Sequence, residues 1–281
     1  MCAFAPGLYV EKMHGTHNDF VVVDERVLRL GDYTAMARRL CAFLAADGLL
    51  AIDQPPRGSE AFASMRIYNA DGSEAEMCGN GMRCVAQYLG ERGAPERFLV
   101  ATAAGPIGIE ILERGAQYCV RVDVGKPQLL DEGREATIDA AGQTWAYRSV
   151  SLGNPHIVIV VDNVAAVDVE RAGAALATHP RFPSGTNVHF LESIDRHQIR
   201  VRHYERGVGI TQSCGTGAVA AAVAAIVAGL VESPVTVQVP GGKLTVEWQP
   251  GGSATLAGPS EKVSGRMLQY GFDRAESLNH H

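Results

Sequence analysis

The chain has 281 residues and a formal net charge of −6 at pH 7, and 46% of its residues are hydrophobic. A soluble chain of this length buries one large core or two smaller ones, and we expect two. The chain is acidic overall and has no block of clustered Lys or Arg that could bind a phosphate backbone, so we expect no nucleic-acid partner.

Residues 1–15 lack the long apolar core of a signal peptide, which predicts a cytoplasmic protein. The cysteines are too sparse for a disulfide framework and are expected to be thiols in that reducing compartment. They are Cys2, Cys41, Cys78, Cys84, Cys119 and Cys214. No His/Cys cluster has the spacing of a zinc site, so we expect no metal.

In chain order, the first half is predicted to form strands interrupted by two helices. Runs rich in β-branched residues predict strands, and an apolar period of 3.6 predicts a helix over 33–44. The turn at 70–73 leads into a second helix that begins next to Cys78. The predicted strands are 8–13, 20–24, 61–69, 98–102, 107–112 and 118–124.

The second half repeats this order. Helices are predicted at 169–178 and, after Cys214, at about 218–230. Residues 207–231 carry no charge and are long enough to span a bilayer, which takes ~20 residues. Their polar beginning and weakly lipophilic Ala/Val end favour instead a helix enclosed by its own domain, so no membrane partner is expected. The predicted strands are 149–152, 157–161, 187–192, 198–205, 235–239, 244–248 and 254–256.

These halves are two copies of one motif. Cys78-Gly79-Asn80-Gly81 recurs as Cys214-Gly215-Thr216-Gly217, an offset of 214 − 78 = 136 residues, and the same offset aligns other segments without a gap. A period this long indicates a duplicated domain rather than a solenoid, whose periods are ~20–50 residues.

The duplication predicts an α+β fold of two pseudo-symmetric lobes. Each lobe is expected to be a curved, mainly antiparallel sheet wrapped around a central helix, because the helix after Cys214 has no polar face. We expect an N-terminal lobe over 7–136 carrying Cys78, a C-terminal lobe over 137–270 carrying Cys214, and a tail over 271–281. The active site is expected in the cleft between the lobes.

The repeated cysteines suggest acid/base chemistry. A thiol at a helix N-terminus has a lowered pKa, and the neighbouring glycines leave backbone N–H groups bare to hold a carboxylate. Two such helix ends that bracket one molecule could invert a stereocentre, with one thiolate removing the α-proton and the opposite thiol returning a proton. A free cysteine alone is also typical of a small buried packing residue, but the duplicated context favours the catalytic interpretation.

These residues closely resemble the cofactor-independent diaminopimelate epimerases. The most specific run is 68–81, Tyr-Asn-Ala-Asp-Gly-Ser-Glu-Ala-Glu-Met-Cys-Gly-Asn-Gly, and 153–156, 186–188 and 204–207 are also similar. The resemblance implies a cleft between two matching lobes and no pyridoxal phosphate or other cofactor. It also implies a homodimer, because members of the family are often dimeric. It also implies interconversion of LL- and meso-diaminopimelate in lysine and peptidoglycan synthesis.

Site roles follow from the resemblance position by position. Cys78 and Cys214 match the acid/base cysteines, and His156 and Glu205 match residues that assist proton movement. The substrate-holding positions are Asn18, Asn69, Asn154, Asn187 and Arg206, and the helix-tip positions that grip the reacting carboxylate are Gly79, Asn80, Gly215 and Thr216.

The chemistry of these side chains agrees, since Arg206 offers a planar fork for a distal carboxylate and the Asn amides both donate and accept. Other interpretations stay open from the residues alone. The asparagines, above all Asn154 before a proline, suit turns. His156 suits a hydrogen-bonded core position, and Glu205-Arg206 suits a solvated pair.

Three positions depart from the family's usual pattern and bear on the substrate: Thr16-His17, the segment 41–48 and Ile210. They leave a racemase of another amino acid, such as histidine, as an alternative. A second alternative is a non-catalytic protein, either a thiol redox sensor or a binding protein, in which the Cys78 and Cys214 thiols would be reactive.

Overall fold

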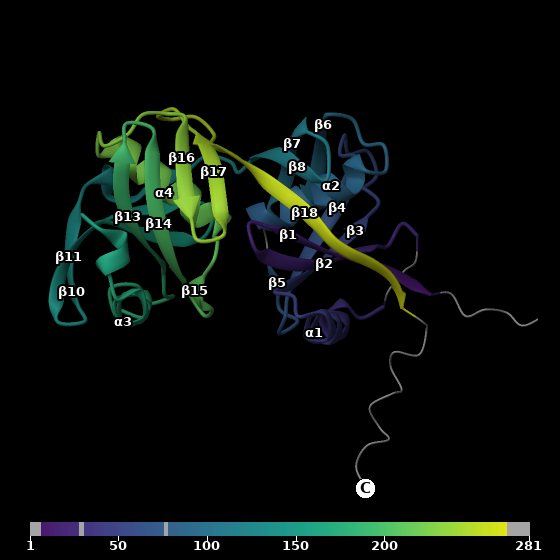
Figure 1. Cartoon of the computed structure of the whole chain (residues 1–281), viewed down its shortest axis with the longest axis horizontal. Coiled ribbons are helices and arrows are strands. Elements are labelled where there is room, and N and C mark those ends of the chain that lie inside the picture. The colour runs from purple at the N-terminus through teal and green to yellow at the C-terminus, as the bar shows by residue number, and fades with distance from the viewer. Residues whose placement is uncertain (1–6, 28–30, 76–77, 269–281) are drawn as a thin grey trace, which may run out of the picture.

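The computed structural model describes residues 7–27, 31–75 and 78–268, and Figure 1 shows their arrangement in two lobes. The first half of the chain forms β1 (Leu8–Gly15), β2 (Asn18–Asp24), α1 (Tyr33–Leu44), β3 (Gly48–Asp53), β4 (Ala63–Asn69), β5 (Glu74–Ala75), α2 (Gly79–Gly90), β6 (Arg97–Thr102), β7 (Gly105–Glu113) and β8 (Gln117–Asp123). The connection and second half form β9 (Gln128–Leu129), η1 (Leu130–Gly133), β10 (Ala136–Ala140), β11 (Gln143–Ser151), β12 (Pro155–Val160), η2 (Val164–Ala166), α3 (Val169–Ala177), β13 (Asn187–Asp195), β14 (Gln198–Glu205), β15 (Gly209–Thr211), α4 (Gly215–Val227), β16 (Val235–Val239), β17 (Gly242–Glu247) and β18 (Thr255–Leu268).

The two halves repeat the same strand pairing, which confirms the predicted duplication. In the first half β2–β3 and β4–β6 are parallel, while β1–β2, β3–β4 and β6–β7 are antiparallel. In the second half β12–β13 and β14–β16 are parallel, while β11–β12, β13–β14 and β16–β17 are antiparallel. The prediction of an α+β fold built on mainly antiparallel sheets is confirmed.

Each sheet encloses one buried helix. Every residue of α2 is buried, and so are nearly all residues of α4 as far as Ala225. Ala and Val let the strands approach α4 closely on all sides, and α2 and α4 share one continuous core. The other two helices, α1 and α3, lie on the outer face of the sheets, capped by Asp32 and Asp168.

The lobes join along β8 and β18, which pair antiparallel. Arg121 lies opposite Ala257, and these residues are separated by 257 − 121 = 136 positions, the offset of the repeat. An approximate twofold axis therefore passes through this pair. Beyond it β18 continues along β1, as the long yellow strand of Figure 1 shows.

The lobe limits of 7–136 and 137–270 stay a prediction. The pairing of β18 with β1 and β8 bears on them, because the end of the last strand hydrogen-bonds to the first half. The predicted tail over 271–281 lies outside the described residues. The uncharged stretch 207–231 holds α4, and among the described residues no helix is long and apolar enough to cross a membrane.

Candidate active site

Cys78 and Cys214 are the N-caps of α2 and α4, as the sequence predicts. The Cys78 Sγ accepts a hydrogen bond from the Gly81 backbone N at 3.4 Å, and the Cys214 Sγ accepts one from the Gly217 N at 3.3 Å. Both cysteines are free. Each sulfur therefore lies at the positive end of a buried helix, which favours a thiolate, but burial outweighs this effect and raises the pKa of both thiols, contrary to the lowered pKa that the sequence predicts.

The two helix tips meet at their glycines. A Cβ added to Gly215 would lie 3.5 Å from the Gly79 Cα and 3.2 Å from the Leu256 Cδ2, and a Cβ added to Gly79 would lie 3.2 Å from the same Leu256 atom. The backbones approach this closely because neither position carries a side chain. The structure thus brings both cysteine-bearing helix ends to one place.

The Asn80 amide ties the two tips together. Its Nδ2 donates to the Asn18 Oδ1 and to the Ser213 backbone oxygen, both at 3.2 Å, and Ser213 directly precedes Cys214. The Asn18 Oδ1 also lies 3.9 Å from the Cys78 Sγ as an acceptor for the thiol. One side of the site is therefore built by Asn18, Asn80 and Cys78.

Asn154, Thr216 and Cys214 build the other side, at the same repeat positions. The Asn154 Nδ2 donates to the Thr216 Oγ1 at 3.4 Å, and that hydroxyl lies 3.7 Å from the Cys214 Sγ. The pseudo-twofold relation seen in the sheets therefore extends to the polar groups around the sulfurs.

Glu205 is a buried carboxyl that interacts with Cys214. Burial raises its pKa, and hydrogen bonds with Thr211 and Cys214 act in the opposite direction. The Thr211 Oγ1 donates to its Oε1 at 2.5 Å. Burial also raises the pKa of Cys214, and Glu205 raises it further. A carboxylate in this position can accept the Cys214 proton.

Cys78 has a different electrostatic environment. Burial raises the pKa of its thiol, whereas hydrogen bonds from the backbone of Gly81 and Asn80 and the charge of Arg83 lower it. Arg83 is fully buried, and it donates from Nε to the Pro259 oxygen at 3.0 Å and from Nη2 to the Thr16 Oγ1 at 3.1 Å. No carboxylate of the described residues pairs with this guanidinium, so its positive charge favours an anion nearby.

The remaining predicted residues lie farther along the same two sides. Asn187 accepts from the Arg206 backbone N at 3.0 Å and donates to the Pro155 oxygen, and the Arg206 Nη1 donates to the Ser184 oxygen at 2.7 Å. Arg206 is close enough to help lower the pKa of His156, after the larger effects of burial and of His203. The Asn69 amide bonds to Ser73 within its own turn.

Sequence reasoning missed several residues around the tips. Asp47 accepts from the Asn18 Nδ2 and from the Asp19 backbone N, both at 2.8 Å, and so orients Asn18. The Thr16 hydroxyl, at 2.7 Å from the Ser213 Oγ, links the two halves. Arg83 could have been found from the sequence, because it is the one charged residue inside the helix predicted after Cys78.

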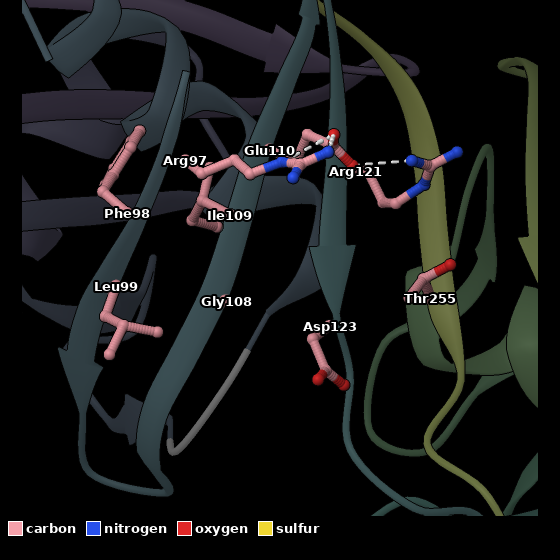
Figure 2. Close-up of a pocket in the computed structure, with 9 residues that line it drawn as sticks. All are labelled: Arg97, Phe98, Leu99, Gly108, Ile109, Glu110, Arg121, Asp123 and Thr255. Carbon is pink, nitrogen blue, oxygen red and sulfur yellow. Dashed lines mark hydrogen bonds and ion pairs between the residues drawn. The ribbon is translucent and has the colours of Figure 1, made fainter. Parts of the chain in front are cut away.

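A separate groove lies away from the cysteines, on the β6–β8 and β18 surface (Figure 2). It has a volume of about 430 Å³, and an ion-paired row of Arg97, Glu110 and Arg121 crosses it. None of the predicted site residues lines this groove. Within the described ranges, no group of three or more His, Cys, Asp or Glu side chains could hold a metal ion.

Comparison with known proteins identifies relatives along nearly the whole chain. The family described as Diaminopimelate epimerase matches residues 10–130 and 148–263. A diaminopimelate epimerase of Pelotomaculum thermopropionicum is 40% identical over 274 residues, which cover 91% of this chain and 97% of that protein. One from Carboxydothermus hydrogenoformans is 41% identical over 269 residues, which cover 90% and 96%.

Solved structures share the fold at low sequence identity. A predicted epimerase from Pseudomonas aeruginosa superposes with a TM-score of 0.73 at 16% identity, covering 93% of this chain and 99% of its own. A hydroxyproline epimerase from Agrobacterium vitis, solved with trans-4-hydroxy-L-proline, gives a TM-score of 0.70 at 18% identity, covering 94% and 92%. These likenesses concern the fold.

Proposed function

Since the chain belongs to the diaminopimelate epimerase family, we propose that it is an isomerase that interconverts LL- and meso-diaminopimelate, a step of lysine and peptidoglycan precursor synthesis. The observation that supports this most directly is the meeting of two cysteine-capped helix tips at Gly79 and Gly215.

The proposed reaction uses two proton transfers and no cofactor. A thiolate on one side breaks the Cα–H bond, and the electron pair remains on the substrate carbon and its carboxylate. The thiol on the opposite side then gives its proton to the other face, so the product has the inverted configuration and the two sulfurs have exchanged protonation states. Glu205, which hydrogen-bonds with Cys214, can take or return the proton that resets that thiol.

The helix tips would stabilise the charge that develops during this step. As the α-carbon loses its proton, negative charge spreads into the α-carboxylate, and backbone N–H groups at both tips face the place where it would lie. Gly79, Asn80, Gly215 and Thr216 supply these positions.

The polar residues on either side would recognise the distal amino-acid head. Arg206 suits its carboxylate as a planar fork, and the amides of Asn18, Asn69, Asn154 and Asn187 suit its ammonium and the α-amino group. In the free protein the Arg206 guanidinium binds the Ser184 oxygen, and substrate would compete for that contact.

We also propose a cytoplasmic homodimer with a small-molecule amino acid as its only obligatory partner. The biosynthetic role of the family supports the location, and sedimentation of the purified protein would test the dimer.

Substrate identity is tested by α-hydrogen exchange. The reduced protein, incubated with LL-diaminopimelate in D2O, should form meso product labelled at one α-carbon, and protein alkylated beforehand is the control. Absence of exchange in folded, reduced protein would refute the proposal. A panel that includes histidine and proline separates the alternatives, since preferential turnover of histidine would indicate a histidine racemase.

A further inference from the structure

Three buried histidines form a hydrogen-bonded chain inside the second half. His156, His189 and His203 lie on β12, β13 and β14 and are 1%, 0% and 0% exposed. The His156 Nδ1 lies 2.8 Å from the His189 Nε2, and the His189 Nδ1 lies 2.8 Å from the His203 Nδ1. Acid/base exchange at the cysteines, as described above, does not need His189 or His203.

The hydrogen-bond partners fix which nitrogen carries each proton. Burial lowers the pKa of His156 and of His203 to about 3 and lowers that of His189 as well, so all three rings are neutral at pH 7. The Asn154 Oδ1, 2.9 Å from the His156 Nε2, can only accept, so His156 is protonated at Nε2. His189 must then donate from Nε2 and His203 from Nδ1.

This chain leads to Cys214. The amide that accepts from His156 through its oxygen donates through its Nδ2 to the Thr216 Oγ1. The Thr216 hydroxyl, which accepts from the Asn154 amide, can direct its own proton to the Cys214 Sγ, 3.7 Å away. From His203 to the sulfur every donor therefore points the same way, toward the thiolate. The far end, the His203 Nε2, is buried with no partner in the described part of the chain.

Among the described residues of the first half, no such chain lies behind Cys78. The register that places His189 opposite His203 places Leu50 opposite Ile67 in the first half. The parallel pairing of β12 with β13 has the same register as that of β2 with β3, and it makes Phe20 the counterpart of His156. The fold thus accepts apolar side chains at all three positions, and buried imidazoles cost more desolvation than these residues.

Helix packing at these positions is also equivalent. A Cβ on Gly217 would lie 2.4 Å from the His189 Cε1, and a Cβ on Gly81 would lie 2.9 Å from the Leu50 Cδ2. His189 and Leu50 therefore fill the same space against the first turn of α4 and α2. This makes leucine a sterically matched replacement for His189.

We propose that His189 and His203 are positioning residues for Cys214. Through His156 they hold the Asn154 amide with its N–H toward Thr216, and so keep the Thr216 hydroxyl as a donor to the Cys214 thiolate. The proposal goes beyond the proposed function, because it makes the two thiols unequal. The charged groups that act on the chain are Arg206 at His156, Arg202 at His203 and Glu205 at Cys214, and all three stay in the variants below.

The test compares the reactivity of each thiol, without substrate. His203→Ile copies the first half, and the pH dependence of iodoacetamide alkylation is followed separately at each cysteine by mass spectrometry. We expect alkylation of Cys214 at neutral pH to fall about tenfold, with Cys78 unchanged, because loss of the chain weakens a hydrogen bond to a charged sulfur. His203→Asn, whose Nδ2 can replace the lost donor, should restore much of the reactivity.

Equal alkylation of Cys214 in wild type and His203→Ile would overturn the proposal, as would failure of His203→Asn to differ from His203→Ile. Because no substrate is used, these outcomes stand apart from any failure of diaminopimelate turnover. If the variants do not fold, ¹⁵N chemical shifts of the wild-type imidazoles decide the matter. Nε2–H on His156 and His189 with Nδ1–H on His203 supports the chain, and any other set of tautomers refutes it.

Discussion

Gly215→Ala tests the close contact of the helix tips. The new Cβ would lie 3.2 Å from the Leu256 Cδ2, 3.3 Å from the Asn80 Oδ1 and 3.5 Å from the Gly79 Cα. Two of these distances are a few tenths of an ångström below an ordinary contact of ~3.5–4.0 Å. The Leu256 side chain can move, whereas the Asn80 amide is held by two hydrogen bonds.

The expected result is a small loss of stability and a larger loss of rate. Overpacking costs about 1–3 kcal/mol, and replacing a helical Gly by Ala returns up to about 1 kcal/mol, so the net destabilisation is on the order of 1 kcal/mol. Misplacement of reacting groups by about 1 Å costs ~100-fold in rate, so a shift of some tenths of an ångström should lower kcat about tenfold.

Urea unfolding and α-hydrogen exchange measure the two quantities on the same preparation. Gly108→Ala is the matched control, since its Cβ would meet only the Asp123 Cβ, at an ordinary 3.5 Å. Gly79→Ala should be milder than Gly215→Ala, because the facing Gly215 Cα would lie 3.9 Å away. Wild-type kcat in Gly215→Ala would refute the view that contact between the tips sets the catalytic geometry.

Three further predictions concern charge. Glu205→Gln removes a proton acceptor beside Cys214 and should lower kcat by about 10²–10⁴-fold, with unchanged stability to urea. Retention of the wild-type rate would exclude the role proposed for Glu205. Arg83→Met removes the buried charge that favours the Cys78 thiolate, so the pH dependence of Cys78 alkylation should move to higher pH and its rate at neutral pH should fall several-fold. Arg83→Lys keeps the charge and should keep the wild-type pH profile, and an Arg83→Met profile identical to that of Arg83→Lys would contradict this account. The neutral buried histidines should make the protein acid-sensitive, because below pH 6.5 the unfolded chain binds protons that the folded chain does not, down to about pH 3 for His156 and His203. Stability should therefore fall as the pH is lowered, by on the order of 1 kcal/mol per pH unit for each histidine, and His189→Leu with His203→Ile should flatten that slope in urea titrations.

The repeat made much of the site predictable. A gap-free offset places equivalent residues at equivalent points of two lobes, so the Cys78 and Cys214 caps and the match of Asn18 with Asn154 could be predicted from spacing alone. The extent of α1 and the positions of most strands followed from apolar periodicity, because each strand has one face on a buried helix.

What the sequence did not predict depends on long-range pairing. β3 was missed because its apolar run is short and follows a helix directly, and the extension of β18 to Leu268 was missed because its partner β1 lies at the other end of the chain. The histidine chain was missed because local pattern does not show that His189 and His203 face each other. At the repeat offset of 136 His203 matches Ile67, but His189 matches Asp53, and only the strand register of the structure shows that Leu50 is its counterpart.

The most direct measurement of the central claim is epimerisation in D2O by the single variants Cys78→Ala and Cys214→Ala, from each stereoisomer. If each sulfur serves one face of the α-carbon, either substitution should lower the rate of stereoinversion by at least ~10²-fold in both directions. Stereoinversion at the wild-type rate by either variant would contradict the account.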